Sequence, residues 1–154
     1  MGAWDTKPWD NDTAADWFCK VFHETNIGEK IREAFELDMD LYHEAIRGAA
    51  CILMFLGRRY VWSSGLDDNL SLAIKKMEEL QQHPYYIKNP EVGHELEYEI
   101  AVLKYHLDMD NKLPATPDFV NWWLSLLRES GPFGGHQTGD FLDCFTKKIR
   151  IKDF

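Results

Sequence analysis

An unbroken apolar run, Ala49–Leu56, constrains the fold more than any other part of the chain. The residues before it, 38–48, already have helical spacing, with Leu41, Ala45 and Ile46 on one side. A helix that is apolar around its whole circumference is contacted by neighbours on several sides. The run is too short to span a bilayer, which needs about 20 apolar residues. The sequence therefore predicts a buried central helix.

Capping residues and helical periodicity divide the rest of the chain into further helices. Asn89-Pro90 and Thr116-Pro117 each place a capping residue before a Pro at the first helical position. Asn11 or Asp12, Thr25 or Asn26, and Asp67 or Asp68 are the expected starts of three others. The expected helices cover about 12–24, 27–37, 38–57, 67–83, 90–107, a segment from 117, and 140–147. We predict an all-α fold of about six or seven helices around the central one.

The length and aromatic content indicate one compact domain over residues 1–154. Six Trp, six Tyr and nine Phe can bury enough surface to offset the chain entropy, which argues against disorder. The N-terminus has neither the basic region nor the apolar core of a secretory signal. Cys19, Cys51 and Cys144 are odd in number and lie in apolar helical segments, which favours free thiols. We expect a cytoplasmic protein.

The N-terminal segment carries a distinctive arrangement of aromatic and capping residues. Trp4 and Trp9 are followed by Asn11-Asp12, just before the first expected helix. The simpler interpretation is structural, because the two indoles can cover the core and Asn and Asp are preferred cap residues. The alternative is a ligand site at the start of the helix. The sequence leaves any role beyond structure open.

These opening residues are similar to a known pattern. Gly2-Ala3-Trp4 and Asn11-Asp12-x-Ala-x-Asp16-Trp17 resemble the start of an uncharacterised bacterial family, a domain of unknown function. Its members begin Gly-x-Trp-Gly-x-Gly-x-Phe-x-Asn-Asp-x-Ala-x-Asp-Trp, and an Ala-rich helix ending in Leu-Gly follows, as in residues 44–57 here. This chain differs in having Asp5 and Lys7 for two Gly. The resemblance covers about the first 60 residues and implies a shared fold, with no assigned activity.

Few residues form a pattern that could carry chemistry. The Gly-rich segment 131–139 lacks the Lys-Ser/Thr of a phosphate loop, and no catalytic set is recognisable. Asp40-x-x-His43 and Glu91-x-x-His94 place a carboxylate and an imidazole on one helix face, as in the dimetal sites of helical bundles. Both carboxylates also lie near helix starts, where an acid is expected because of the helix dipole. We therefore expect no metal and no cofactor, with these four residues as the candidate ligands if one binds.

The net charge of −9 disfavours nucleic-acid binding and favours a basic partner. Glu95, Glu97 and Glu99 are expected opposite the apolar stripe of Leu96, Ile100 and Leu103, and Asp108 and Asp110 follow. Like charges at i and i+4 repel, and a basic partner would relieve that repulsion. Trp122 is a further candidate, because neighbouring Trp122 and Trp123 cannot both enter one core from the same helix.

These observations predict a non-enzymatic protein-binding domain, such as an immunity or inhibitor protein that neutralises a toxin or other effector. Small size, acidity, surplus aromatic residues and the lack of a catalytic set favour it. The expected partner is a protein with a basic surface, and neither nucleic acid nor membrane. The alternative is a small metal-dependent enzyme with a His/carboxylate site between the helices of His43 and His94.

Overall fold

The computed structural model describes residues 12–59, 61–62 and 64–128. All regular structure in these ranges is helical, which confirms the predicted all-α class. The chain groups into two compact units, residues 1–113 and 114–154. They are described separately, and the expected single domain over 1–154 stays a prediction. The N-terminal Trp4, Trp9 and Asn11, the segment 131–139, Cys144 and the helix expected over 140–147 lie outside the described residues.

Unit 1 contains six helices within its described residues, and unit 2 contains one. Those of unit 1 are α1 (Asp12–Glu24), α2 (Ile27–Phe35), α3 (Met39–Leu56), α4 (Leu66–Gln81), α5 (Pro84–Lys88) and α6 (Pro90–Leu107). The described helix of unit 2 is α7 (Pro117–Arg128). Every helix expected over the described residues is present, and α5 is an addition that the periodicity did not predict.

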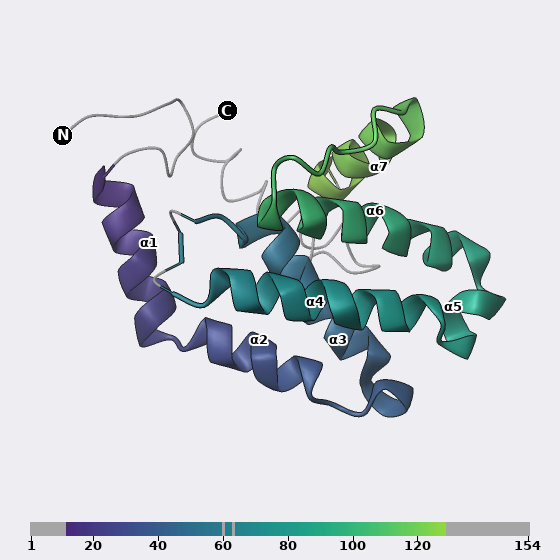
Figure 1. The fold of residues 1–154 in the computed structure, drawn as a ribbon, viewed down its shortest axis with the longest axis horizontal. Helices are drawn as coiled ribbons and strands as arrows, with labels where there is room; N and C mark the ends of the chain where they lie inside the picture. The colour runs from purple at the N-terminus through teal and green to yellow at the C-terminus, as the bar shows by residue number, and fades with distance from the viewer. Residues whose placement is uncertain (1–11, 60, 63, 129–154) are drawn as a thin grey trace, which may run out of the picture. The chain divides into compact units, whose positions relative to one another are not determined.

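The core of unit 1 forms where α3 and α4 meet. Helix α4 packs against α2, α3, α5 and α6, and α3 packs against α2, α4 and α6. In Figure 1, α4 lies between α2 and α6, with α3 behind it. Leu53 of α3 and Leu70 and Met77 of α4 are fully buried. These contacts confirm a buried central helix, although α4 packs against more helices than the predicted α3 does.

The apolar run in α3 is not buried around its whole circumference. Ala49, Ala50, Leu53 and Met54 are buried, whereas the remaining members of the run are only partly covered. Helical spacing explains the division, because the buried positions follow i, i+1, i+4 and i+5 and face the helices packed against α3. The expectation of complete burial is therefore wrong in detail, while the position of the helix is right.

Side chains from elsewhere in unit 1 complete the C-terminal end of α3. The indole Nε1 of Trp62 donates to the carbonyl oxygen of Leu56 at 2.7 Å. The Nε2 of His106, from α6, lies 2.6 Å from the carbonyl oxygen of Met54. The last carbonyls of a helix have no partner within the helix, so these bonds satisfy acceptors that would otherwise be orphaned.

The helix starts agree with the expected capping residues only in part. The Thr116 hydroxyl accepts from the Phe119 amide at 3.3 Å, as predicted. Asn26 precedes α2 but has a positive φ of 51° and makes no side-chain cap bond. Helix α4 begins at Leu66, after Gly65 with a φ of 73°, and not at Asp67 or Asp68. A glycine adopts that left-handed backbone without strain, which explains the earlier start.

Helix α5 is short, and its start is formed by the His83-Pro84 pair of the sequence. The His83 side chain accepts from the Tyr85 amide at 3.2 Å, and Pro84 occupies the first turn. Helix α6 then approaches α5 closely at Gly93, where a Cβ would lie 2.7 Å from the Tyr86 carbonyl oxygen. Because α5 occupies only one turn, its apolar spacing is too short to reveal a period.

Candidate functional site

An ion pair with a buried carboxylate joins α3 to α6 within unit 1. The Arg47 Nε lies 3.0 and 3.1 Å from the two Glu99 carboxylate oxygens, and Arg47 Nη2 also donates to Glu99. The same Nη2 donates to Glu95 at 3.2 Å. Glu99 is 5% exposed, and the Arg47 guanidinium is the cation paired with its carboxylate. A bidentate guanidinium–carboxylate pair of this kind fixes the geometry of both helices.

Two histidines and two tyrosines join α3 to α5 beside that ion pair. The Nδ1 of His43 lies 3.0 Å from the Tyr86 hydroxyl, and the His43 ring contacts the Tyr85 ring at 4.8 Å between centroids. The Nε2 of His83 lies 3.3 Å from an Asp40 carboxylate oxygen. Because the Nδ1 of His83 accepts the Tyr85 amide, a neutral His83 carries its proton on Nε2, facing Asp40. Both interactions attach α5 to the first turns of α3.

The surroundings of this network shift the pKa of several of its groups. Burial raises the pKa of Glu99, and the Arg47 guanidinium only partly opposes the effect. Burial also raises the pKa of the Tyr86 hydroxyl and of the Cys51 thiol, the latter to about 11. Burial lowers the pKa of Arg47, but the hydrogen bonds and charge of Glu99 raise it overall. A thiol with a raised pKa is a poor nucleophile, so this environment does not activate Cys51. The role of the network is to hold the helices together.

The four candidate metal ligands are not brought together as a site. Asp40 lies against His83, and His43 lies against Tyr86. In α6, the Nε2 of His94 lies 3.0 Å from the Tyr98 hydroxyl and its Nδ1 lies 3.4 Å from Glu97. Glu91 is exposed in the first turn of α6. Over the described ranges, no group of three or more His, Cys, Asp or Glu side chains is arranged to hold a metal.

An open pocket lies where α4, α5 and α6 meet. Gln81, Tyr86, Gly93, His94 and Glu97 contribute to its lining, together with Gln82 and Pro90. The side chains of His94 and Glu97 in its lining already contact each other. The pocket therefore offers the side-chain amides of Gln81 and Gln82 and this pair, and it carries no recognisable reaction centre.

The predicted acidic face of α6 is corrected in one important respect. Glu99 is buried, whereas Glu95 is half-buried and Glu97, Asp108 and Asp110 are exposed. Glu99 lies three residues after Leu96 and four before Leu103, so helical spacing places it on the apolar stripe and not opposite it. The repulsion between Glu95 and Glu99 is relieved within the chain by Arg47. This repulsion therefore gives no indication of a basic partner, and the partner-binding role of Glu95, Glu97, Asp108 and Asp110 stays a prediction.

The predicted exposure of Trp122 is also wrong. Trp122 is 8% exposed in α7, and its ring lies 5.6 Å from the Phe119 ring and 5.9 Å from the Trp123 ring, between centroids. Trp123, the other member of the pair, is only partly buried, so the two indoles do not both enter one core. Trp122 is not the exposed anchor that the sequence argument required.

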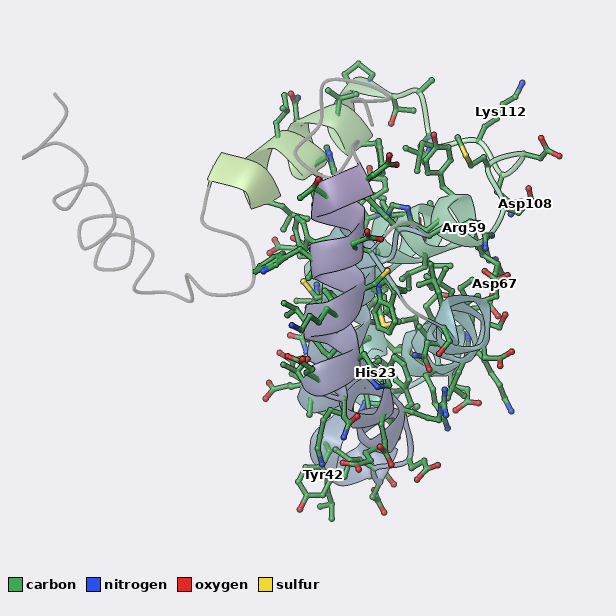
Figure 2. The ribbon with its side chains drawn as sticks, turned by 90° about the vertical axis from the view of Figure 1, so that its left-hand side faces the viewer. His23, Tyr42, Arg59, Asp67, Asp108 and Lys112 are labelled. Carbon is green, nitrogen blue, oxygen red and sulfur yellow. The ribbon has the colours of Figure 1, made fainter. Side chains whose placement is uncertain are left out.

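A different acidic surface forms where α2 ends and α3 begins; residues 36–44 are hereafter the acidic turn. Leu41 and Tyr42 are 74% and 50% exposed, and Leu37 is 39% exposed. The surrounding carboxylates, which are all exposed, are Glu36, Asp38, Asp40 and Glu44. Tyr42 lies at the lower end of unit 1 in Figure 2. The sequence already contained the relevant pattern, because no Lys or Arg occurs between Arg32 and Arg47.

The acidic turn has a defined backbone. The Asp38 carboxylate accepts from the Asp40 and Leu41 amides at 2.9 and 3.3 Å. The helix then breaks at Tyr42, whose φ of −128° and ψ of 24° are not helical. Asp40 and His43, on either side of this break, contact His83 and Tyr86. The apolar side chains of the turn are therefore displayed on a backbone that is attached to α5.

No helix among the described residues is long and apolar enough to cross a membrane. Neither a curated protein nor a solved structure matches the chain. The family described as Domain of unknown function (DUF4259) matches residues 2–86, which is more than half of the chain. The matched range includes the acidic turn and extends beyond the 60 residues that carried the resemblance in the sequence. The chain therefore belongs to this family of domains of unknown function.

Proposed function

We propose that the protein is a non-enzymatic protein-binding domain that acts in the cytoplasm and neutralises a basic partner, such as a toxin or other effector. The acidic turn is the observation that carries this proposal. It combines exposed Leu41 and Tyr42 with four exposed carboxylates and no nearby Lys or Arg in the sequence. Exposed aromatic anchors surrounded by charge are typical of protein-binding sites, and the acidic rim selects a basic partner.

The polar contacts of unit 1 support the same assignment. Arg47 and Glu99, His43 and Tyr86, and His83 and Asp40 contact one another in pairs. Each of these ionisable side chains therefore has a structural role, because each pair links α3 to another part of unit 1. The alternative of a metal-dependent enzyme has no comparable support, because its candidate ligands Asp40, His43, Glu91 and His94 are not assembled into a group.

The proposal is tested by isolating a partner at low ionic strength and then reconstituting the complex from purified proteins. We expect a stoichiometric complex whose association slows as salt is added, because screening weakens attraction between opposite charges. We also expect the bound partner to lose its own activity. A purified protein that gains no partner, or whose partner binds equally fast at all salt concentrations, would contradict the proposal.

A further inference from the structure

We infer that the acidic turn is the contact surface for the partner, and that the partner presents an apolar recess rimmed by Lys or Arg. This inference rests on the proposed function and names the chemistry of the partner surface. Leu41, at 74% exposed, and Tyr42, at 50%, are adjacent, and Tyr85 of α5, at 41%, is held at the same end of unit 1 through its ring contact with His43. Side chains that project from a turn fit into a recess on another molecule.

The charge around these side chains identifies the kind of recess. Glu36, Asp38, Asp40 and Glu44 are exposed around the turn, and the described contacts of the first turn of α3 include no Lys or Arg. A second copy of the same surface would bring like charges together, which opposes association. A membrane with anionic lipids would be repelled for the same reason. Basic side chains on a partner protein complement the rim.

Ile87 and Met109, two other exposed apolar side chains of unit 1, lack this combination. Ile87 is 60% exposed but precedes Lys88, and Met109 is 71% exposed on the loop after α6. Each is a single large apolar side chain without a second at the adjacent position. They are therefore suitable control positions, with exposure similar to that of Tyr42 and Leu41.

The backbone of the turn lowers the entropy cost of binding. The Asp38 cap, the Asp40–His83 contact and the His43–Tyr86 contact hold the turn in one conformation before a partner arrives. Preorganised anchors lose less freedom when they are bound. Substitutions that test binding should therefore avoid Asp38, Asp40 and His43, whose removal would also alter the turn itself.

The first experiment places a photo-crosslinking amino acid at Tyr42 of the full chain, with Ile87 and Met109 as control positions. We expect Tyr42 to crosslink to the purified partner and the two controls to crosslink far less. Crosslinks from Ile87 or Met109 without one from Tyr42 would overturn the inference and leave the proposed function intact. No crosslink to a protein from any position, in a chain that remains folded, would count against both. Crosslinks to a second copy or to lipid vesicles would also overturn the inference.

The second experiment separates the apolar anchors from the acidic rim by kinetics. Leu41→Ser with Tyr42→Ala should raise the dissociation rate of the purified complex by roughly tenfold or more, as expected for anchor residues. Glu36→Gln with Glu44→Gln should slow association by about threefold or more at low salt and weaken its salt dependence. The matched control, Glu91→Gln with Asp110→Asn, removes the same charge elsewhere and should change association by less than about twofold. Equal effects of the two charge variants would overturn the inference.

Discussion

At the scale of single residues, the polar side chains of unit 1 mostly complete the hydrogen bonding of helices. Trp62 and His106 satisfy carbonyls at the end of α3, and Asn69 links α4 to Arg32 of α2 at 3.2 and 3.3 Å. Asn69 is 1% exposed, so the loss of its partner would leave a buried amide unsatisfied. His106 and Cys51 also have consequences that depend on pH.

His106 should make the folded state sensitive to mild acid. Burial lowers the pKa of His106, the Met54 carbonyl opposes this, and Arg58 adds to the lowering. The unfolded chain therefore binds the proton first, and stability falls as the pH drops below about 6.5 towards the lower pKa of the folded state. Urea unfolding between pH 8 and 5 should show a steeper loss for the wild type than for His106→Gln. His23→Gln, at an exposed position, is the control and should keep the wild-type slope.

Cys51 should react slowly with alkylating reagents in the folded protein. Its pKa of about 11 arises from burial first, with a further increase from Glu99 and an opposing effect of Arg47. At pH 8 the thiolate fraction should be about two orders of magnitude below that of an ordinary thiol. The rate of iodoacetamide labelling of the Cys51 peptide, measured by mass spectrometry, should rise tenfold per pH unit. Labelling as fast in the native protein as in urea would contradict this prediction.

At the scale of elements, α3 combines two different tasks. Its C-terminal half contributes Leu53 and Met54 to the core, and its first turn displays Leu41 and Tyr42. The non-helical backbone at Tyr42 separates these parts. Arg47 lies between them and attaches α3 to α6 through Glu99. The stability of this attachment can be measured directly.

Removing one member of the Arg47–Glu99 pair should be more harmful than removing both. Arg47→Met leaves the buried Glu99 carboxylate unpaired, which should lower the free energy of unfolding by about 3–5 kcal/mol. Glu99→Gln should cost less, because 26% of the Arg47 side chain is exposed and Glu95 remains within 3.2 Å. The double variant Arg47→Met with Glu99→Leu should recover part of the loss, because no charge remains buried.

Lys76→Met provides the matched control in urea unfolding. Lys76 has 25% of its side chain exposed, close to Arg47, but its partner Glu79 is 40% exposed. Ion pairs with access to water contribute about 0–1 kcal/mol. If Arg47→Met were no more harmful than Lys76→Met, the buried pair would not stabilise the α3–α6 packing as argued.

At the scale of the whole molecule, the sequence predicted the helices better than it predicted the surfaces. Apolar spacing and the Asn89-Pro90 and Thr116-Pro117 starts located long helices, because each depends on local chemistry alone. The spacing of Glu99 from Leu96 and Leu103 is a local indication that it is buried. Its partner Arg47 lies 52 residues away, and no local pattern reveals that pairing. Tyr85 of α5 contacts His43 of the acidic turn, and only the fold brings these distant residues together.

The fragment 1–113 should fold without the rest of the chain. The principal helix contacts of the described residues lie among α1 to α6, all within unit 1. We expect this fragment to keep its helical circular dichroism and a cooperative thermal transition, because the core at α3 and α4 is contained in it. If the fragment melts without cooperativity, residues 114–154 are needed for folding and the single domain predicted from the sequence is correct.

The break at Tyr42 divides α3 into two parts that should exchange amide protons with solvent at different rates. The Asp40 and Leu41 amides are bonded to the exposed Asp38 carboxylate, whereas Leu53 and Met54 lie in the core. Local opening of the first turn needs no disruption of that core, so deuterium should enter it sooner. A partner held by the turn would delay that uptake while leaving the Leu53 region unchanged. Deuterium uptake by the first turn of α3, measured by mass spectrometry, should therefore report whether a partner is bound. The partner itself needs no label.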